Sequence, residues 1–77
     1  MTKITLPELG EGIDQATVAC IHFRQGDTIE QEDDLLEVVT DKATFNVAAG
    51  TAGVVKEILV KEHQEVKIGE TLALIEP

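Results

Sequence analysis

The chain has 77 residues, with six Lys and Arg against fifteen Asp and Glu, and a formal net charge of −9. A domain of this length buries only about 60% of its unfolded surface, which argues against an enclosed substrate pocket and an independent enzyme. The acidic charge argues against nucleic acid and anionic membranes, because phosphate binding needs clustered cations. We therefore expect no nucleic-acid and no membrane partner.

The residue types also limit the compartment and the chemistry. A single cysteine excludes an internal disulfide, and no Cys/His spacing suits zinc, so we expect no metal. No apolar run approaches the ~20 residues of a membrane span, and residues 1–4 lack an apolar signal core. These features predict a cytoplasmic location in a bacterium, or the mitochondrial matrix in a eukaryote.

Short apolar runs, mostly with a period of two, predict strands along the whole chain. Turn signals containing glycine separate many of these runs, and no segment has an amphipathic pattern long enough for a stable helix. The pattern predicts an all-β sandwich or barrel. In chain order, the expected strands cover residues 3–6, 16–23, 35–39, 44–47, 54–60 and 71–75, with shorter pieces at 28–29 and 65–66.

The chain repeats its apolar pattern at an offset of 37 residues. In each half, a three-residue step between apolar positions (Val18 to Ile21, and Val55 to Ile58) breaks strict alternation and predicts a β-bulge at the same place. We expect two similar β-units facing each other about a pseudo-twofold axis. Two unrelated strand sets with generic patterning remain the alternative. The aligned pairs are Val18 with Val55, Ile21 with Ile58, Phe23 with Val60, Arg24 with Lys61, Ile29 with Val66, Asp33 with Glu70, Leu35 with Leu72, and Val38 with Ile75.

The two halves are joined by residues 39–43, and the turn within this link reads Thr-Asp-Lys-Ala at 40–43. Shifted by the repeat, this link falls on the chain ends, so we expect it at the end of the domain opposite the termini. Asp41 suits a turn because its carboxylate can bond to nearby backbone N–H groups. Lys42 would then project from a hairpin tip into water. Taken alone, it is most simply a solvated charge.

Segments around this turn resemble a known family. They read LPELGEGI at residues 6–13, GDTI at 26–29 and EVVTDKA at 37–43, followed by Gly53-x-Val55-x-x-Ile58-x-Val60 and Val66-x-x-Gly69. Together they resemble the lipoyl domain of the dihydrolipoamide acyltransferase component of 2-oxo acid dehydrogenase complexes, over essentially the whole chain. The resemblance implies a flattened barrel of two four-stranded sheets. It also implies covalent lipoate on Lys42, with Asp41 and Ala43 as flanking turn residues.

The resemblance further implies a carrier without its own active site. A lipoylating ligase or transferase would attach the cofactor. A thiamine-diphosphate decarboxylase would load the lipoyl group by reductive acylation, the acyltransferase domain would pass the acyl group to coenzyme A, and dihydrolipoamide dehydrogenase would reoxidise the dithiol. Residues 1–77 would form a single lipoyl domain, monomeric in isolation, in the N-terminal part of a longer acyltransferase.

A glycine-containing acidic loop covers residues 8–15. In the family, the corresponding loop lies beside the lipoyl-lysine turn and helps the decarboxylase choose its domain, which makes Glu8, Glu11, Gly12 and Asp14 candidates for partner contact. The alternative is a mobile loop whose glycines serve turn geometry. A denser acidic group at residues 30–37 is either a solvated face or a surface that steers a basic partner.

One departure from the family pattern and two rival functions remain open. The family usually has Gly-Asp in both halves, but His63 and Gln64 stand at the positions equivalent to Gly26 and Asp27, which leaves the second turn undetermined. His22 and His63 have no evident companion ligands, and Cys20 is expected to pack as a small hydrophobe. One rival is a biotin carrier, in which methionines usually flank the modified lysine. The other is an unmodified barrel that acts as an interaction module.

Overall fold

The computed structural model describes every residue from Met1 to Pro77 and contains strands and turns without any helix. All the expected strands are present, although three end earlier than predicted: β1 at Thr5, β2 at Ile21 and β6 at Ile58. There is accordingly no helix that could cross a membrane. The strands are β1 (Thr2–Thr5), β2 (Gln15–Ile21), β3 (Thr28–Ile29), β4 (Asp34–Val39), β5 (Thr44–Ala48), β6 (Gly53–Ile58), β7 (Glu65–Lys67) and β8 (Thr71–Glu76).

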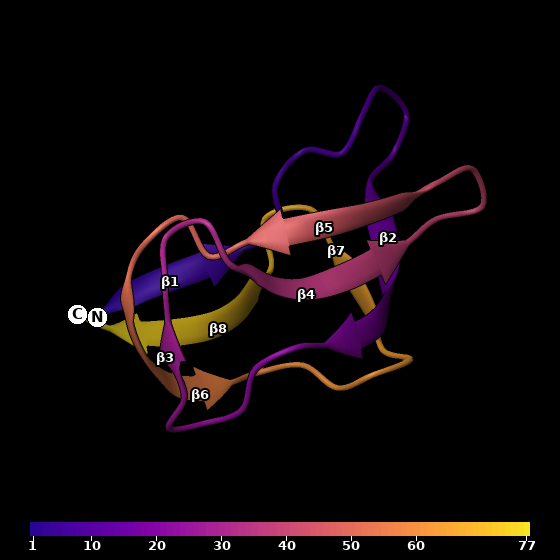
Figure 1. The fold of residues 1–77 in the computed structure, drawn as a ribbon. Helices are drawn as coiled ribbons and strands as arrows, with labels where there is room; N and C mark the ends of the chain where they lie inside the picture. Colours follow the sequence, from indigo (N-terminus) through magenta and orange to yellow (C-terminus); the bar gives the residue numbers. More distant parts are fainter.

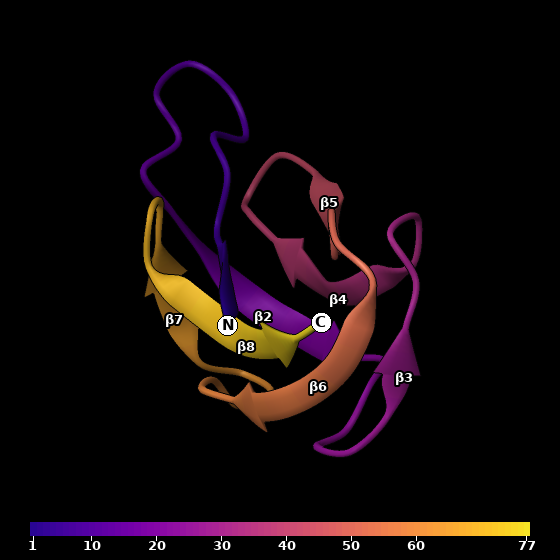
Figure 2. The ribbon, with the colours of Figure 1, turned by 90° about the vertical axis from the view of Figure 1, so that its left-hand side faces the viewer.

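The strands form two four-stranded antiparallel sheets, in the orders β1-β8-β6-β3 and β5-β4-β2-β7. Figures 1 and 2 show the curved sheets wrapped around a common interior. The two orders coincide when β1 is matched with β5, β8 with β4, β6 with β2, and β3 with β7. The all-β flattened barrel and its pseudo-twofold symmetry are therefore confirmed.

The predicted bulges occur at equivalent places in the two halves. The pairing of β2 with β4 shifts register between Val18 and Cys20. The pairing of β6 with β8 shifts between Val55 and Glu57, which are 37 residues further on. The extra residue in each strand keeps the apolar positions on the core side despite the three-residue step.

The core is entirely apolar: sixteen residues are buried and none of them is polar. The repeat pairs Val18 with Val55, Ile29 with Val66, Leu35 with Leu72, and Val38 with Ile75 are all fully buried. Each such aliphatic side chain contributes about 1.5–3 kcal/mol by leaving water. Ile21, Phe23 and Ile58 pack at the margin of this core and stay partly exposed.

The second turn adopts the conformation of the first despite its different residues. The backbone N–H of Arg24 donates to Asp27 Oδ2 at 2.8 Å, and that of Lys61 donates to Gln64 Oε1 at 3.0 Å. Gly26 has a φ of 94° and His63 a φ of 73°. His63 is the one non-glycine residue with a positive φ, a conformation that costs an L-residue about 1–2 kcal/mol.

The two chain ends lie at one end of the elongated molecule, which measures 33 × 20 × 17 Å. Thr2 pairs with Ile75, which places the termini side by side. In Figure 1 they lie at the left, and the turn between β4 and β5 projects at the right. The prediction that this turn and the termini occupy opposite ends is confirmed.

Candidate functional site

The turn between β4 and β5 is closed by Thr40. Its backbone N–H donates to the carbonyl of Ala43 at 2.8 Å. Its hydroxyl accepts hydrogen bonds from the backbone N–H groups of Lys42 and Ala43, each at 3.2 Å, and donates to the Ala43 carbonyl at 3.2 Å. A hydroxyl has one donor and two acceptor sites, so Thr40 uses all of them here. The Asp41 carboxylate was expected to accept hydrogen bonds from nearby backbone N–H groups. The Thr40 hydroxyl, one residue earlier, accepts them instead.

Lys42 lies at the tip of this ordered turn with its side chain in water. Asp41, Lys42 and Ala43 are all exposed. The one ion pair of the molecule joins Lys56 to Glu76 at 3.9 Å, and no hydrogen bond involves Lys42 Nζ. The backbone of Lys42 is therefore held while its amine is free. An amine in this setting can be acylated without breaking any contact of the fold, so the residues present fit a covalently attached carboxylic acid.

The acidic loop lies beside this turn, as expected. A groove of about 350 Å³ lies between them, and among its lining residues Gln15 Nε2 donates to Glu65 Oε2 at 3.0 Å. The N–H of Ile68 donates to the carbonyl of Asp14 at 3.0 Å, which anchors the end of the loop. The groove is lined by Gly12, Ile13, Asp14, Gln15, Thr17, Thr40, Asp41, Lys42 and Glu65.

The loop candidates divide into two pairs. Gly12 and Asp14 line the groove together with Asp41 and Lys42. Glu8 and Glu11 instead line a hollow formed by the loop alone, on residues 8–14. Figure 2 shows this loop protruding from the body between β1 and β2. The structure thus brings two of the four candidates to the lysine turn and leaves the other two on the outer part of the loop.

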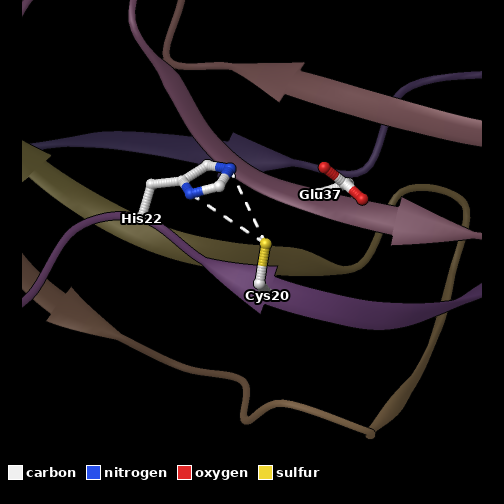
Figure 3. Close-up of side chains that lie close together, drawn as sticks. All are labelled: Cys20, His22 and Glu37. Atoms are coloured by element: carbon white, nitrogen blue, oxygen red, sulfur yellow. Dashed lines mark hydrogen bonds between the residues drawn. The ribbon is translucent and has the colours of Figure 1, made fainter.

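A second cluster lies on the sheet that contains β2. Cys20 is paired with Glu37 across β2 and β4, and Cys20 Sγ lies 3.8 Å from Nε2 and 4.0 Å from Nδ1 of His22 (Figure 3). Desolvation raises the pKa of the Cys20 thiol, as do the nearby carboxylates of Glu37 and Glu62, so it stays protonated at neutral pH. His22 therefore has two neighbouring side chains with donor atoms, Cys20 and Glu37, which were not predicted from the sequence.

Sequence reasoning missed this cluster because only strand pairing brings Glu37 near the other two residues. The Cys-x-His spacing did give a weak signal for a cluster, because residues two apart in a strand lie on the same face. The register that adds Glu37 depends on the bulge between Val18 and Cys20, which moves every later pairing by one residue. His63 belongs to the second turn and is not part of this cluster.

Known proteins resemble this chain in sequence and in fold. The family described as "Biotin-requiring enzyme", the biotin/lipoyl family, matches residues 2–75. The acetyltransferase component of the pyruvate dehydrogenase complex of Corynebacterium glutamicum is 38% identical over 74 residues, which cover 96% of this chain and 11% of that protein. The succinyltransferase component of the 2-oxoglutarate dehydrogenase complex of Rickettsia conorii is 38% identical over 73 residues, covering 95% of this chain and 18% of that protein.

A solved structure is similar over its full length. The lipoyl domain of the 2-oxoglutarate dehydrogenase complex from Azotobacter vinelandii has a TM-score of 0.79 and 30% identity, covering 100% of this chain and 98% of that domain. The chain spans less than a fifth of the length of the two acyltransferase relatives above. Because the family matches nearly every residue and a lipoyl domain matches end to end, the chain belongs to the biotin/lipoyl family as a lipoyl domain.

Proposed function

We propose that this chain is a carrier domain that bears lipoate on Lys42 Nζ, within a dihydrolipoamide acyltransferase of a 2-oxo acid dehydrogenase complex. The observation that supports this most is the free amine at the tip of an ordered turn, at the end of the molecule opposite the termini. A tether at the termini would leave that tip free to reach separate active sites. Such tethering holds a carrier at an effective concentration of up to about millimolar.

The chemistry divides between the chain and the group it would carry. A primary amine is the side chain that takes an activated carboxylic acid as a stable amide, and the stem of Lys42 extends the reach of whatever is attached. Lipoate, when bound, supplies a dithiolane that accepts an acyl group on one sulfur as its disulfide is reduced. Thr40 keeps the attachment point in one conformation, and the barrel remains outside the active site that the arm enters.

Lipoate is favoured over biotin by the residues beside the lysine. Asp41 and Ala43 flank Lys42, whereas methionines usually flank the lysine of biotin carriers. The two acyltransferase relatives are both named as dihydrolipoyllysine-residue enzymes. A biotin carrier is the second candidate because the matching family is described by biotin.

The proposed partners follow from the parent enzyme. They are a thiamine-diphosphate decarboxylase, the acyltransferase catalytic domain, dihydrolipoamide dehydrogenase and a lipoylating ligase or transferase. The parent would be a longer acyltransferase with this domain in its N-terminal part, located in the bacterial cytoplasm or the mitochondrial matrix. In this proposal the domain carries an acyl group between the active sites of others and has none itself.

The attachment site is tested by intact-mass measurement. After co-expression with a lipoylating ligase and lipoate, the mass should rise by one lipoyl group, and the formal charge should change from −9 to −10 as the amine is acylated. Lys42→Arg should abolish the gain. Lys61→Arg, at an exposed lysine elsewhere, should leave it unchanged. Modification of the Lys42→Arg variant, or incorporation of biotin in its place, would overturn the assignment.

Partner recognition by the groove is tested with a matched pair of loop variants. Asp14→Asn changes a groove carboxylate, and Glu8→Gln changes one on the outer loop. Both should be lipoylated normally. We expect Asp14→Asn to slow reductive acylation by the cognate decarboxylase more than Glu8→Gln does. Equal rates for both variants and the wild type would remove the groove from recognition.

A further inference from the structure

The cluster of Cys20, His22 and Glu37 is separate from the lysine turn and has no role in the proposed carrier function. Its three side chains offer a sulfur, an imidazole nitrogen and a carboxylate oxygen, and these atoms all lie within 4.8 Å of one another. Figure 3 shows them converging from β2, from the segment that follows it, and from β4. We propose that Cys20, His22 and Glu37 bind a zinc-like divalent cation, with water completing the coordination.

The spacing of the donor atoms is close to what zinc requires. Zn–S bonds of about 2.3 Å and Zn–N bonds of about 2.0–2.1 Å, at tetrahedral angles, place a sulfur and a nitrogen about 3.5 Å apart. The observed distance between Cys20 Sγ and His22 Nε2 is 3.8 Å. The Glu37 carboxylate lies within 4.8 Å of both of these atoms, and its long, half-exposed side chain has rotatable bonds that allow it to move closer.

Backbone hydrogen bonds hold the three donors in register. Cys20 and Glu37 are cross-strand partners in the pairing of β2 with β4. The N–H of His22 donates to the carbonyl of Leu35 at 2.9 Å, which continues this pairing beyond the end of β2. Two neighbouring strands and the residue that follows β2 therefore hold the three ligands side by side before any ion binds.

The local charge also favours a cation. Glu62 lies on the same side, where its Oε2 accepts a hydrogen bond from the N–H of Ile21 at 3.3 Å. Neither Glu37 nor Glu62 takes part in an ion pair, since the one ion pair of the molecule joins Lys56 and Glu76. Two carboxylates without an ion-pair partner therefore lie near the thiol. On binding a divalent cation, the Cys20 thiol would release its proton to solvent and coordinate the ion as thiolate, and the cation would offset the charge of the carboxylates.

The donor set selects the type of metal. Thiolate and imidazole are ligands of zinc and of later first-row metals, whereas magnesium and calcium prefer oxygen alone. Cys20 and Glu37 are partly exposed and His22 is exposed, which leaves room for one or more waters. With three protein ligands and an accessible position, the site is of the open type.

The test uses the 77-residue chain with Lys42→Arg, so that no dithiol competes for the metal, in the presence of a non-thiol reductant. Zinc should bind at one ion per chain in calorimetric titration, without dimer formation in sedimentation. Cobalt should give a sulfur-to-metal charge-transfer band and the intense visible bands of a tetrahedral ion. Zinc should also raise the Tm, because it binds the folded chain.

Matched variants separate this site from adventitious binding. Cys20→Ser, His22→Gln and Glu37→Gln should each weaken zinc binding by about tenfold or more, since even outer-shell changes cost about 10–100-fold. Cys20→Ser should also remove the charge-transfer band. His63→Gln, at the other histidine, should leave affinity unchanged. Unchanged affinity in Cys20→Ser, loss of affinity in His63→Gln, an ion shared between two chains, or no saturable binding would each overturn the proposal.

Discussion

The two halves of the chain differ most in their turns at residues 24–27 and 61–64. The first contains Gly26 and Asp27, and the second contains His63 and Gln64. Even so, both turns contact the opposite half in the same way. Gly26 N–H donates to the carbonyl of Val55, and His63 N–H donates to that of Val18, each at 2.7 Å.

The reciprocal bonds complete the pattern. The N–H of Val55 donates to the carbonyl of Asp27, and the N–H of Val18 donates to that of Gln64, each at 2.8 Å. Each turn therefore holds the valine that precedes the bulge of the other half. The comparison shows that backbone pairing between the halves sets the conformation of both turns. The side chains in these turns can differ without changing that conformation.

The comparison of the halves is tested most strongly in the core. Leu35 and Leu72 are equivalent and both fully buried. Changing either to Ala should lower the free energy of unfolding by about 3 kcal/mol, because each deletion leaves a cavity. Urea denaturation followed by circular dichroism measures the effect. Leu59→Ala is the control, since Leu59 is 43% exposed and should cost less than about 1 kcal/mol. A cost at one buried leucine but not at the other would break the equivalence.

A smaller effect on stability is expected where equivalent residues of the two halves differ in side-chain size. Ala16 and Gly53 are equivalent, and each pairs with a buried residue, Val66 and Ile29 respectively. A Cβ on Gly53 would overlap the carbonyl oxygen of Glu76 and lie 2.9 Å from Ile75 Cγ2. Gly53→Ala should therefore destabilise the domain by about 2–3 kcal/mol.

The reverse substitution serves as the control for Gly53. Ala16→Gly should cost about 1 kcal/mol, from lost burial and greater backbone freedom in the unfolded chain. Both values come from thermal unfolding, where 1 kcal/mol shifts the Tm by about 4–8 °C in a domain of this size. If Gly53→Ala were neutral, β8 would be free to move away from β6, and the close approach of these strands would not matter for stability.

The next largest effects on stability are expected from the side chains of the two turns. Asp27 and Gln64 each accept a hydrogen bond from a backbone N–H three residues earlier. Asp27→Ala should cost about 1.5 kcal/mol and Gln64→Ala about 1 kcal/mol, because an ionised acceptor makes the stronger bond. Urea midpoints of the two variants measure the difference. A larger loss for Gln64→Ala would show that the second turn depends on its side chain more than the first does.

Much of this fold is predictable because burial of an apolar core governs the spacing of residues such as Val18, Leu35, Val55 and Leu72. The same spacing predicts both bulges and the position of the lysine turn opposite the termini. The role of Thr40 was not predicted, because it depends on which residue of a four-residue turn points its side chain inward. Pairing register, which a sequence pattern does not specify, brings Glu37 to Cys20.

The smallest effect tests the backbone conformation that the two turns share. His63 has a φ of 73°, where glycine is unstrained and other residues are not. His63→Gly should therefore raise the free energy of unfolding by about 0.5–1 kcal/mol and the Tm by about 3–6 °C.

Gly26→His is the matched reverse change, since a Cβ on Gly26 meets no atom within 4 Å and only the positive φ opposes it. It should lower the free energy of unfolding by about the amount that His63→Gly adds. Calorimetry on both variants and on the double variant, which exchanges the two residues, measures this balance. If the exchange is close to neutral, the shared φ sets the cost. If both single variants shift in the same direction, contacts of the His63 ring matter more than the backbone conformation.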